Sequence, residues 1–203
     1  MDSTDLDFYT RILRELAQTH GISKDARVLV ACGGLKDKAA LEEIGFSDVT
    51  ISNLDTRTPP DAFAPYRWSL QDVERLTFKD EEFDFAIVHN GLHHCYSPHR
   101  ALTELLRVAK RGILAVEPRD GWLQRRFVKL GFGQEFEIDS VVKNDYEGGG
   151  VANTRIPNFI YRWNEYEVEK AARCALPWGR PELRFFYALR LNTRRYEELR
   201  NPL

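Results

Sequence analysis

The sequence predicts an α/β protein with one doubly wound, mostly parallel sheet. Between residues 27 and 117, short apolar runs alternate five times with segments of helical or loop character. The runs are apolar along most of their length, which is typical of parallel strands that helices cover on both faces. Because strand–helix–strand connections are right-handed, few topologies remain for such a chain.

Five strands and three helices are expected in this part of the chain. The strands are expected at 27–31, 48–54, 66–70, 84–90 and 113–117, and the helices at 6–19, 36–45 and 98–110. The first helix places five apolar side chains on one face: Leu6, Tyr9, Ile12, Leu13 and Leu16. Gly21 and Gly45 end the first two helices, and Pro98 suits the first turn of the third, with Ser97 as its N-cap.

After Pro118 the pattern becomes less regular. A helix is expected at 121–132, a strand at 158–163, a helix at 165–176 capped by Asn164, and a long final strand at 182–191. Residues 137–157 have no clear period, and their run of three glycines suggests a mobile lid over a binding site. No linker or repeat divides the chain, so we expect a single domain over residues 1–203, with a core at about 22–118.

Composition excludes several classes of protein. The chain is 43% hydrophobic and 30% charged, as in ordinary globular proteins. A net charge of −2 argues against general affinity for nucleic acid. The three cysteines form no closely spaced pair, and no apolar run is long enough to span a bilayer. We therefore expect a cytoplasmic protein with reduced thiols that binds neither nucleic acid nor membrane.

Glycines and polar side chains follow the ends of the expected strands. A nucleotide-like ligand in such a sheet binds outside the carboxyl ends, where the strand order reverses. The candidate cofactor residues at that edge are Ala31, Cys32, Gly33, Gly34, Asp55, Asp72, Val73, His89 and Asn90. Glycines let a backbone approach a ligand closely, and a carboxylate can accept the hydroxyls of a ribose. Each feature alone also fits an ordinary turn or a capping aspartate.

Four segments carry a more specific resemblance. Residues 72–85 resemble the "D-A-E-x-L-P-F-x-D-x-x-F-D" segment of class I, type 11-like S-adenosylmethionine (SAM)-dependent methyltransferases of the small-molecule type. The segments 92–94, 101–108 and 117–118 are similar to the "L-H-H", "A-L-x-E-x-x-R-V" and "E-P" elements of that family. These segments stand in the family's order and spacing, and with the first strand the resemblance covers residues 27–118.

The resemblance implies a fold, a cofactor and a set of roles. The fold would be a three-layer Rossmann-like sandwich with strand order 3-2-1-4-5-7-6 and an antiparallel final strand. The cofactor would be SAM, with Asp55 at the ribose, Asp72 and Val73 at the adenine, and the glycine turn below the methionine part. His89 and Asn90 would line the same pocket, and the acceptor would be a small polar metabolite.

The first strand departs from the family pattern. Val30 stands near the usual acidic position, and Ala31 replaces the first glycine of the usual G-x-G-x-G. This departure keeps a second interpretation open, in which the chain is a catalytically inactive methyltransferase-like binding or scaffold domain. A nicotinamide-dependent oxidoreductase is disfavoured, because C-G-G-L-K follows the first strand in place of G-x-G-x-x-G.

Two adjacent histidines invite a catalytic hypothesis. His94 is our candidate general base, since a histidine can accept a proton near neutral pH, whereas His93 is expected to shape the loop. A zinc site formed by His89, His93, His94 and Cys95 is disfavoured, because its members straddle a strand-to-loop junction. The sequence therefore leads us to expect no metal ion.

Residues outside the core sheet are candidates for binding the acceptor. Aromatic rings beside arginines can stack on a ring and pair with a carboxylate or phosphate. The candidates are Tyr9, Trp122, Arg126, Tyr146 and Arg162. Packed aromatics and solvated arginines are the alternative for most of them.

Overall fold

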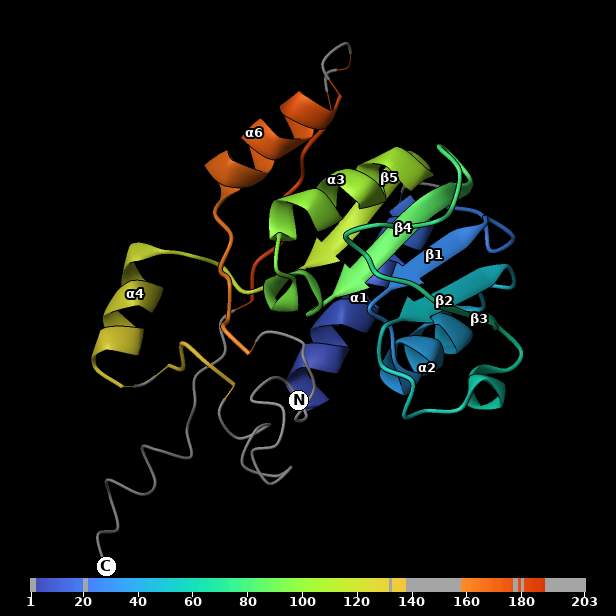
Figure 1. Cartoon of the computed structure of the whole chain (residues 1–203), viewed down its shortest axis with the longest axis horizontal. Coiled ribbons are helices and arrows are strands. Elements are labelled where there is room, and N and C mark those ends of the chain that lie inside the picture. Colours follow the sequence, from blue (N-terminus) through green and yellow to red (C-terminus); the bar gives the residue numbers. More distant parts are fainter. Residues whose placement is uncertain are drawn as a thin grey trace, which may run out of the picture.

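A five-stranded parallel sheet forms the centre of the computed structural model (Figure 1), which describes residues 3–19, 22–131, 133–137, 158–176, 179 and 181–188. The strands are β1 (Val28–Ala31), β2 (Val49–Asn53), β3 (Arg67–Leu70), β4 (Phe83–His89) and β5 (Ala109–Val116). Their order is β3-β2-β1-β4-β5, and every neighbouring pair is parallel. The α/β class and the first five positions of the expected order are confirmed.

Burial explains why these runs form strands. All four residues of β1 are buried, and Val30 lies between Ile51 of β2 and Ile87 of β4. Branched apolar side chains pack well on a pleated surface that is covered on both sides.

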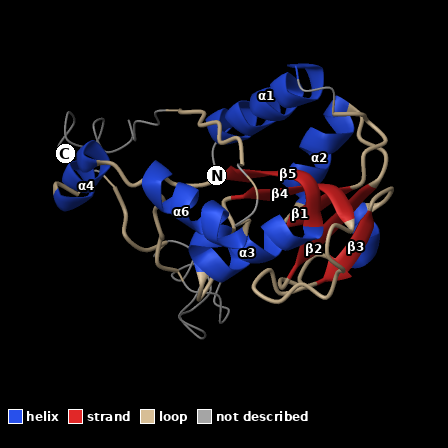
Figure 2. Ribbon diagram, turned by 90° about the horizontal axis from the view of Figure 1, so that it is seen from above, coloured by secondary structure: helices blue, strands red, loops and turns tan. Residues whose placement is uncertain are grey.

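Helices cover the two faces of the sheet, as the view in Figure 2 shows. The helices α1 (Ser3–Thr19) and α2 (Leu35–Ile44) lie on one face, and α3 (Pro98–Val108) lies on the other. Two apolar clusters separate these layers, one containing Tyr9 and Leu41 and the other containing Leu105. The helix α6 (Glu165–Ala175) packs on the outside of α3. Among the described helices, none is long and apolar enough to cross a membrane.

The helix boundaries follow the expected signals. Gly45 ends α2 with φ 91°, a left-handed conformation that suits glycine. Asn164 caps α6, since its side chain accepts the N–H of Glu167. Ser97 is the N-cap of α3, although its side chain makes no capping hydrogen bond. Gly21, the expected end of α1, lies outside the described residues.

The segment between β3 and β4 forms no helix and is instead attached to α3. Glu104 accepts the N–H of Leu76 at 2.9 Å, and Arg107 donates to the carbonyls of Leu76 and Phe78 at 3.0 and 2.8 Å. Arg107 also contacts Glu104 and Asp80. The segments 72–85 and 101–108, which both resemble elements of the methyltransferase family, are therefore joined by one network of hydrogen bonds and ion pairs.

Two expected strands do not form among the described residues. Residues 158–163 make only isolated bridges, because Phe159 pairs with Phe136 while Trp163 pairs with Arg119. Partners on two different segments prevent a continuous ladder. Residues 182–188 form no strand, and Tyr187 contacts Glu165 and Arg119 instead. Residues 189–191 lie outside the description.

Candidate functional site

The loops after β1 and β4 meet at the carboxyl edge of the sheet. A Cβ atom on Gly91 would lie 2.5 Å from Cβ of Cys32, so only glycine fits between the two loops. Cys32 and Asn90 both have φ 54°, which turns the chain sharply at the end of each strand. The N–H of Asn90 is bonded to the carbonyl of Val116 at 2.8 Å. A ligand that contacts one of these loops is therefore close to the other.

The glycine turn is tightly packed on one side and open on the other. A Cβ on Gly33 would lie 2.8 Å from side-chain atoms of both Val30 and Ile51, whereas one on Gly34 would meet nothing nearer than 4.0 Å. The N–H of Gly33 also donates to the carbonyl of Ser52 at 2.9 Å. Gly33 therefore serves the close packing of the turn, and Gly34 leaves space.

Asn53 is a residue of this edge that sequence reasoning missed. It ends β2, and its side-chain amide donates to the carbonyl of Gly33 at 3.1 Å. Its side-chain oxygen accepts the N–H of Asp55 at 3.1 Å. The feature of the sequence that could have indicated it is that Asn53 is a polar residue at the end of a strand, two residues before Asp55.

Asp55 is engaged by its neighbour Arg57. The Arg57 Nε lies 2.8 and 3.0 Å from the two carboxylate oxygens, and its Nη2 makes a further contact. The hydrogen bond from Arg57 lowers the pKa of the Asp55 carboxyl, against the effect of partial burial. A ligand that binds the Asp55 carboxylate would therefore displace this guanidinium or share the carboxylate with it.

Asp72 and Val73 occupy the loop after β3. The Asp72 carboxylate accepts the N–H of Glu74 at 2.9 Å. Val73 is buried in the same apolar cluster as Ala31 and Leu92, with Cys32 packed against that cluster. This loop therefore lies beside the turn after β1.

A buried polar cluster joins α1, α2 and β4. The rings of Tyr9 and His89 are stacked with centroids 4.2 Å apart, and His89 Nδ1 lies 3.5 Å from a carboxylate oxygen of Asp37. Burial raises the pKa of Tyr9 well above its ordinary value, and the nearby Asp37 raises it further. Asp37 also accepts the N–H of Gly34 at 2.8 Å. It was missed in the sequence, where its position three residues after Gly34 is the signal of a helix cap.

Glu117 organises the loop that carries the two histidines. Its buried carboxylate accepts the N–H groups of Gly91, Leu92 and His93 at 2.9, 2.8 and 3.3 Å. It also lies 2.7 Å from Nδ1 of His93. These contacts hold the short 3-10 helix η2 (Leu92–His94) at the ends of β4 and β5. The "L-H-H" and "E-P" segments are therefore also joined physically.

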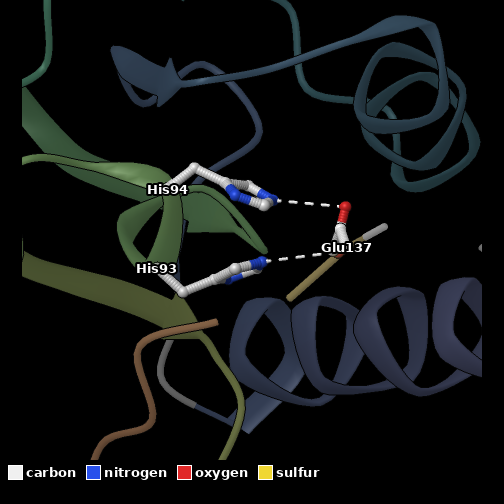
Figure 3. A group of neighbouring side chains, drawn as sticks. All are labelled: His93, His94 and Glu137. Atoms are coloured by element: carbon white, nitrogen blue, oxygen red, sulfur yellow. Dashed lines mark ion pairs between the residues drawn. The ribbon is translucent and has the colours of Figure 1, made fainter. Parts of the chain in front are cut away.

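His93 and His94 both face Glu137, which lies on a different segment (Figure 3). His93 Nε2 lies 3.8 Å from Oε1 of Glu137, and His94 Nε2 lies 3.6 Å from Oε2. Burial lowers the pKa of His93, but the hydrogen bond to Glu117 and the carboxylate of Glu137 together raise it to about 9. Glu137 was missed by sequence reasoning, because only the fold brings it to the histidines.

The expected acceptor residues do not share one surface. Tyr9 is fully buried in α1, whereas Trp122 and Arg126 are exposed on α4 (Trp122–Lys129), which stands apart from α1 in Figures 1 and 2. Arg162 donates to the carbonyls of Ile160 and Gln134. Tyr146 and the glycine run expected to form a lid lie outside the described residues.

The described part of the chain contains three free cysteines. A hydrogen bond with Cys32 and burial both raise the pKa of the Cys95 thiol. Cys95 is therefore protonated at neutral pH and is a poor nucleophile there.

Part of the chain is similar to known proteins. Residues 28–116 match the family model described as "Methyltransferase domain". The uncharacterized protein MJ1123 of Methanocaldococcus jannaschii is 34% identical over 70 residues, which make up 33% of this chain and 34% of that protein. The match thus spans about a third of that relative's length.

Solved structures share the fold. A putative methyltransferase of Bacillus halodurans, BH2331, aligns with a TM-score of 0.55 and 18% identity over 80% of this chain and 67% of its own. A SAM-dependent methyltransferase of Methanosarcina mazei aligns with a TM-score of 0.55 and 19% identity, over 77% of this chain and 82% of its own.

Proposed function

We propose that this protein is a SAM-dependent methyltransferase acting on a small polar metabolite, because residues 28–116 match the family model described as "Methyltransferase domain". The observation that carries the proposal is that the family match covers all five strands of the sheet. The contact between the loops after β1 and β4 supports it further, since one ligand at this edge would touch both.

The cofactor residues have distinct proposed roles. Gly34 leaves backbone open to the methionine part, and Asp55 binds the ribose hydroxyls after Arg57 moves aside. Asp72 accepts the adenine amino group, and Val73 packs against the ring. Asn90 lines the pocket from the β4 side. His89 fixes the wall of the pocket, because its ring stacks on Tyr9 and contacts Asp37.

The chemistry requires little beyond alignment. SAM supplies an activated methyl group on a sulfonium, and the acceptor's lone pair forms the new bond to carbon while the carbon–sulfur bond breaks. Holding the acceptor in line therefore does most of the work. We assign His94 Nε2 as the group that takes the acceptor's proton, since it lies at the same edge as Asn90.

Calorimetric titration with SAM tests the cofactor site. We expect binding to wild-type protein, no binding of NAD, and at least tenfold weaker SAM binding by Asp55→Ala, because a hydrogen bond to a charged group is worth about 1.5–3 kcal/mol. Asp25→Ala is the matched control, since Asp25 is exposed and precedes β1 at the opposite edge. Absence of SAM binding to the wild type, or equal weakening by both variants, would contradict the assigned pocket.

A catalytically inactive binding domain is the second candidate. The observations that favour it are the buried, apolar Val30 at the first-strand position and the engagement of Asp55 by Arg57. Incubation with SAM and a panel of small hydroxyl and amine compounds separates the two. Formation of S-adenosylhomocysteine that depends on a panel compound supports the enzyme. SAM binding with no turnover across the panel supports the binding domain.

A further inference from the structure

Three potential metal ligands converge at the end of η2. One ring nitrogen each of His93 and His94 and a carboxylate oxygen of Glu137 all lie within 4.8 Å of one another. In Figure 3 both rings, which come from the same short helix, point at the carboxylate from the other segment. His93 is buried and Glu137 is partly exposed, so the group lies between the protein interior and solvent.

The histidine–glutamate distances are longer than those of typical hydrogen bonds. The distances of 3.6 and 3.8 Å between nitrogen and oxygen exceed the range of about 2.7–3.2 Å for N–H···O bonds. A zinc ion bound at about 2.0–2.2 Å from each ligand places neighbouring ligand atoms about 3.3–3.5 Å apart in a tetrahedral site. The two histidine–glutamate distances are within a few tenths of an ångström of that spacing, and all three ligand atoms lie within 4.8 Å of one another.

The orientation of the rings also favours a shared cation. Nδ1 of His93 lies 2.7 Å from a carboxylate oxygen of Glu117, which leaves Nε2 as the ring nitrogen that faces Glu137. The centroids of the two imidazole rings are 4.0 Å apart, so both rings can reach an ion beside the same carboxylate. One divalent cation would bind both rings and the carboxylate.

We propose that His93, His94 and Glu137 bind a divalent transition-metal ion, with zinc as the ion of choice. Two imidazoles and one carboxylate form a set that catalytic zinc sites use, and such sites keep a position open for water or substrate. Magnesium and calcium prefer oxygen ligands and suit this set poorly.

The surroundings of the ligands are built as a metal site requires. A metal-bound histidine usually donates its other ring N–H to a carboxylate, which fixes its orientation. Glu117 provides that carboxylate to His93 and is itself held by three backbone N–H groups.

The segment that carries Glu137 is fixed by backbone hydrogen bonds. The N–H of Glu137 donates to the carbonyl of Asn158, and the N–H of Ile160 donates to that of Glu135, both at 2.8 Å. The N–H of Tyr161 reaches the carbonyl of His93 at 3.5 Å. The third ligand is therefore brought to the histidines by the two paired segments together.

The metal site would compete with the role of base that is proposed for His94 in methyl transfer. A metal ion and an acceptor's proton would use the same lone pair on His94, so the metal-bound protein cannot use His94 as a base. The variant Glu137→Gln separates the two roles, because it removes a metal ligand and leaves His94 in place.

The test is calorimetric titration of tag-free, chelator-treated protein with Zn²⁺, followed by the visible spectrum with Co²⁺. We expect Glu137→Gln to bind Zn²⁺ at least 100-fold more weakly than the wild type, since loss of an outer partner alone costs about 10–100-fold. Glu135→Gln is the matched control, because Glu135 is an exposed carboxylate two residues away whose backbone contact is kept. Glu117→Gln should weaken binding about 10–100-fold.

The outcomes are distinct. Strong Zn²⁺ binding by the wild type and Glu135→Gln, weak binding by Glu137→Gln and a Co²⁺ spectrum without thiolate charge-transfer absorption support the site. Equal affinity in Glu137→Gln and the wild type would show adventitious binding elsewhere and overturn the proposal. Wild-type protein that binds neither ion below millimolar concentration also overturns it and leaves His93 as a buried cation paired with two glutamates. Thermal melts of metal-free Glu137→Gln check that the variant is folded.

Discussion

The sheet region at residues 28–116 and the following region at 117–188 are stabilised in different ways. In the first, parallel ladders join five strands, and α3 buries five side chains against them. In the second, α4 buries no side chain, α6 buries only Ala172, and the described segments between them meet through isolated bridges. The first region therefore contains the continuous apolar core, and the described part of the second joins that core through Trp163 and the side chains of Tyr161, Val168 and Ala171 that pack against the same cluster.

The comparison bears on how the candidate site is divided. Loops fixed by the sheet carry Gly34, Asn90 and the two histidines, whereas Glu137 comes from the second region, where its N–H donates to the carbonyl of Asn158. The proposed cofactor edge belongs to the first region, and the proposed metal site bridges both.

Truncating one leucine in each region should give the largest contrast between the regions. Leu105 is fully buried in α3, so Leu105→Ala should lower the free energy of unfolding by about 2–5 kcal/mol through lost contacts and a cavity. Leu130, at the end of α4, is 67% exposed, and Leu130→Ala should change the free energy of unfolding by no more than about 0.5 kcal/mol. Urea denaturation measures both. Similar losses in the two variants would show that the second region has a core of its own.

A smaller effect is expected where the loops after β1 and β4 touch. Gly91→Ala would place a methyl group 2.5 Å from Cβ of Cys32, and the required backbone shift should cost about 1–3 kcal/mol. Gly112→Ala in β5 is the control, because its nearest neighbour would be 3.9 Å away in Phe85. The control should be neutral or slightly stabilising in thermal melts. If Gly91→Ala has the melting temperature of the wild type, the loops after β1 and β4 have room for an added methyl group, which contradicts the proposed close contact.

The smallest expected change in stability comes from removing one glutamate that forms an ion pair in each region. The hydrogen bond from Arg107 lowers the pKa of Glu104, so this contact stabilises the fold above the ordinary glutamate value of 4.5 and is lost as the pH falls through the lowered value. Glu104→Gln should cost about 1 kcal/mol at pH 7 and show a shallower loss of stability below pH 4.5 than the wild type.

Glu169→Gln on α6 is the matched control for the pH experiment. Its partner Arg173 is exposed, and such surface pairs contribute about 0–1 kcal/mol and are screened by salt. Unfolding curves between pH 7 and pH 3 should therefore separate the two variants. Parallel curves for Glu104→Gln and the wild type would contradict the role given to Glu104.

The five strands could be predicted from the sequence because each is a short apolar run whose burial is local information. The last two strands could not, since whether a run such as 158–163 forms a ladder depends on its partners. Phe159 and Trp163 pair with different segments, and neither partner is visible in the pattern of the run itself. The capping roles of Asn164 and Gly45 were predicted because caps depend on only a few neighbouring residues.

The sequence by itself determined the α/β class, the first five strands, and which residues follow the strand ends, because periodicity and parallel pairing place these at one edge. Only the tertiary structure decided what those residues contact. It paired Asp55 with Arg57, buried Tyr9 against His89, and brought Glu137 to two histidines far earlier in the chain. Such contacts depend on long-range packing and charge, which no local pattern of residues encodes.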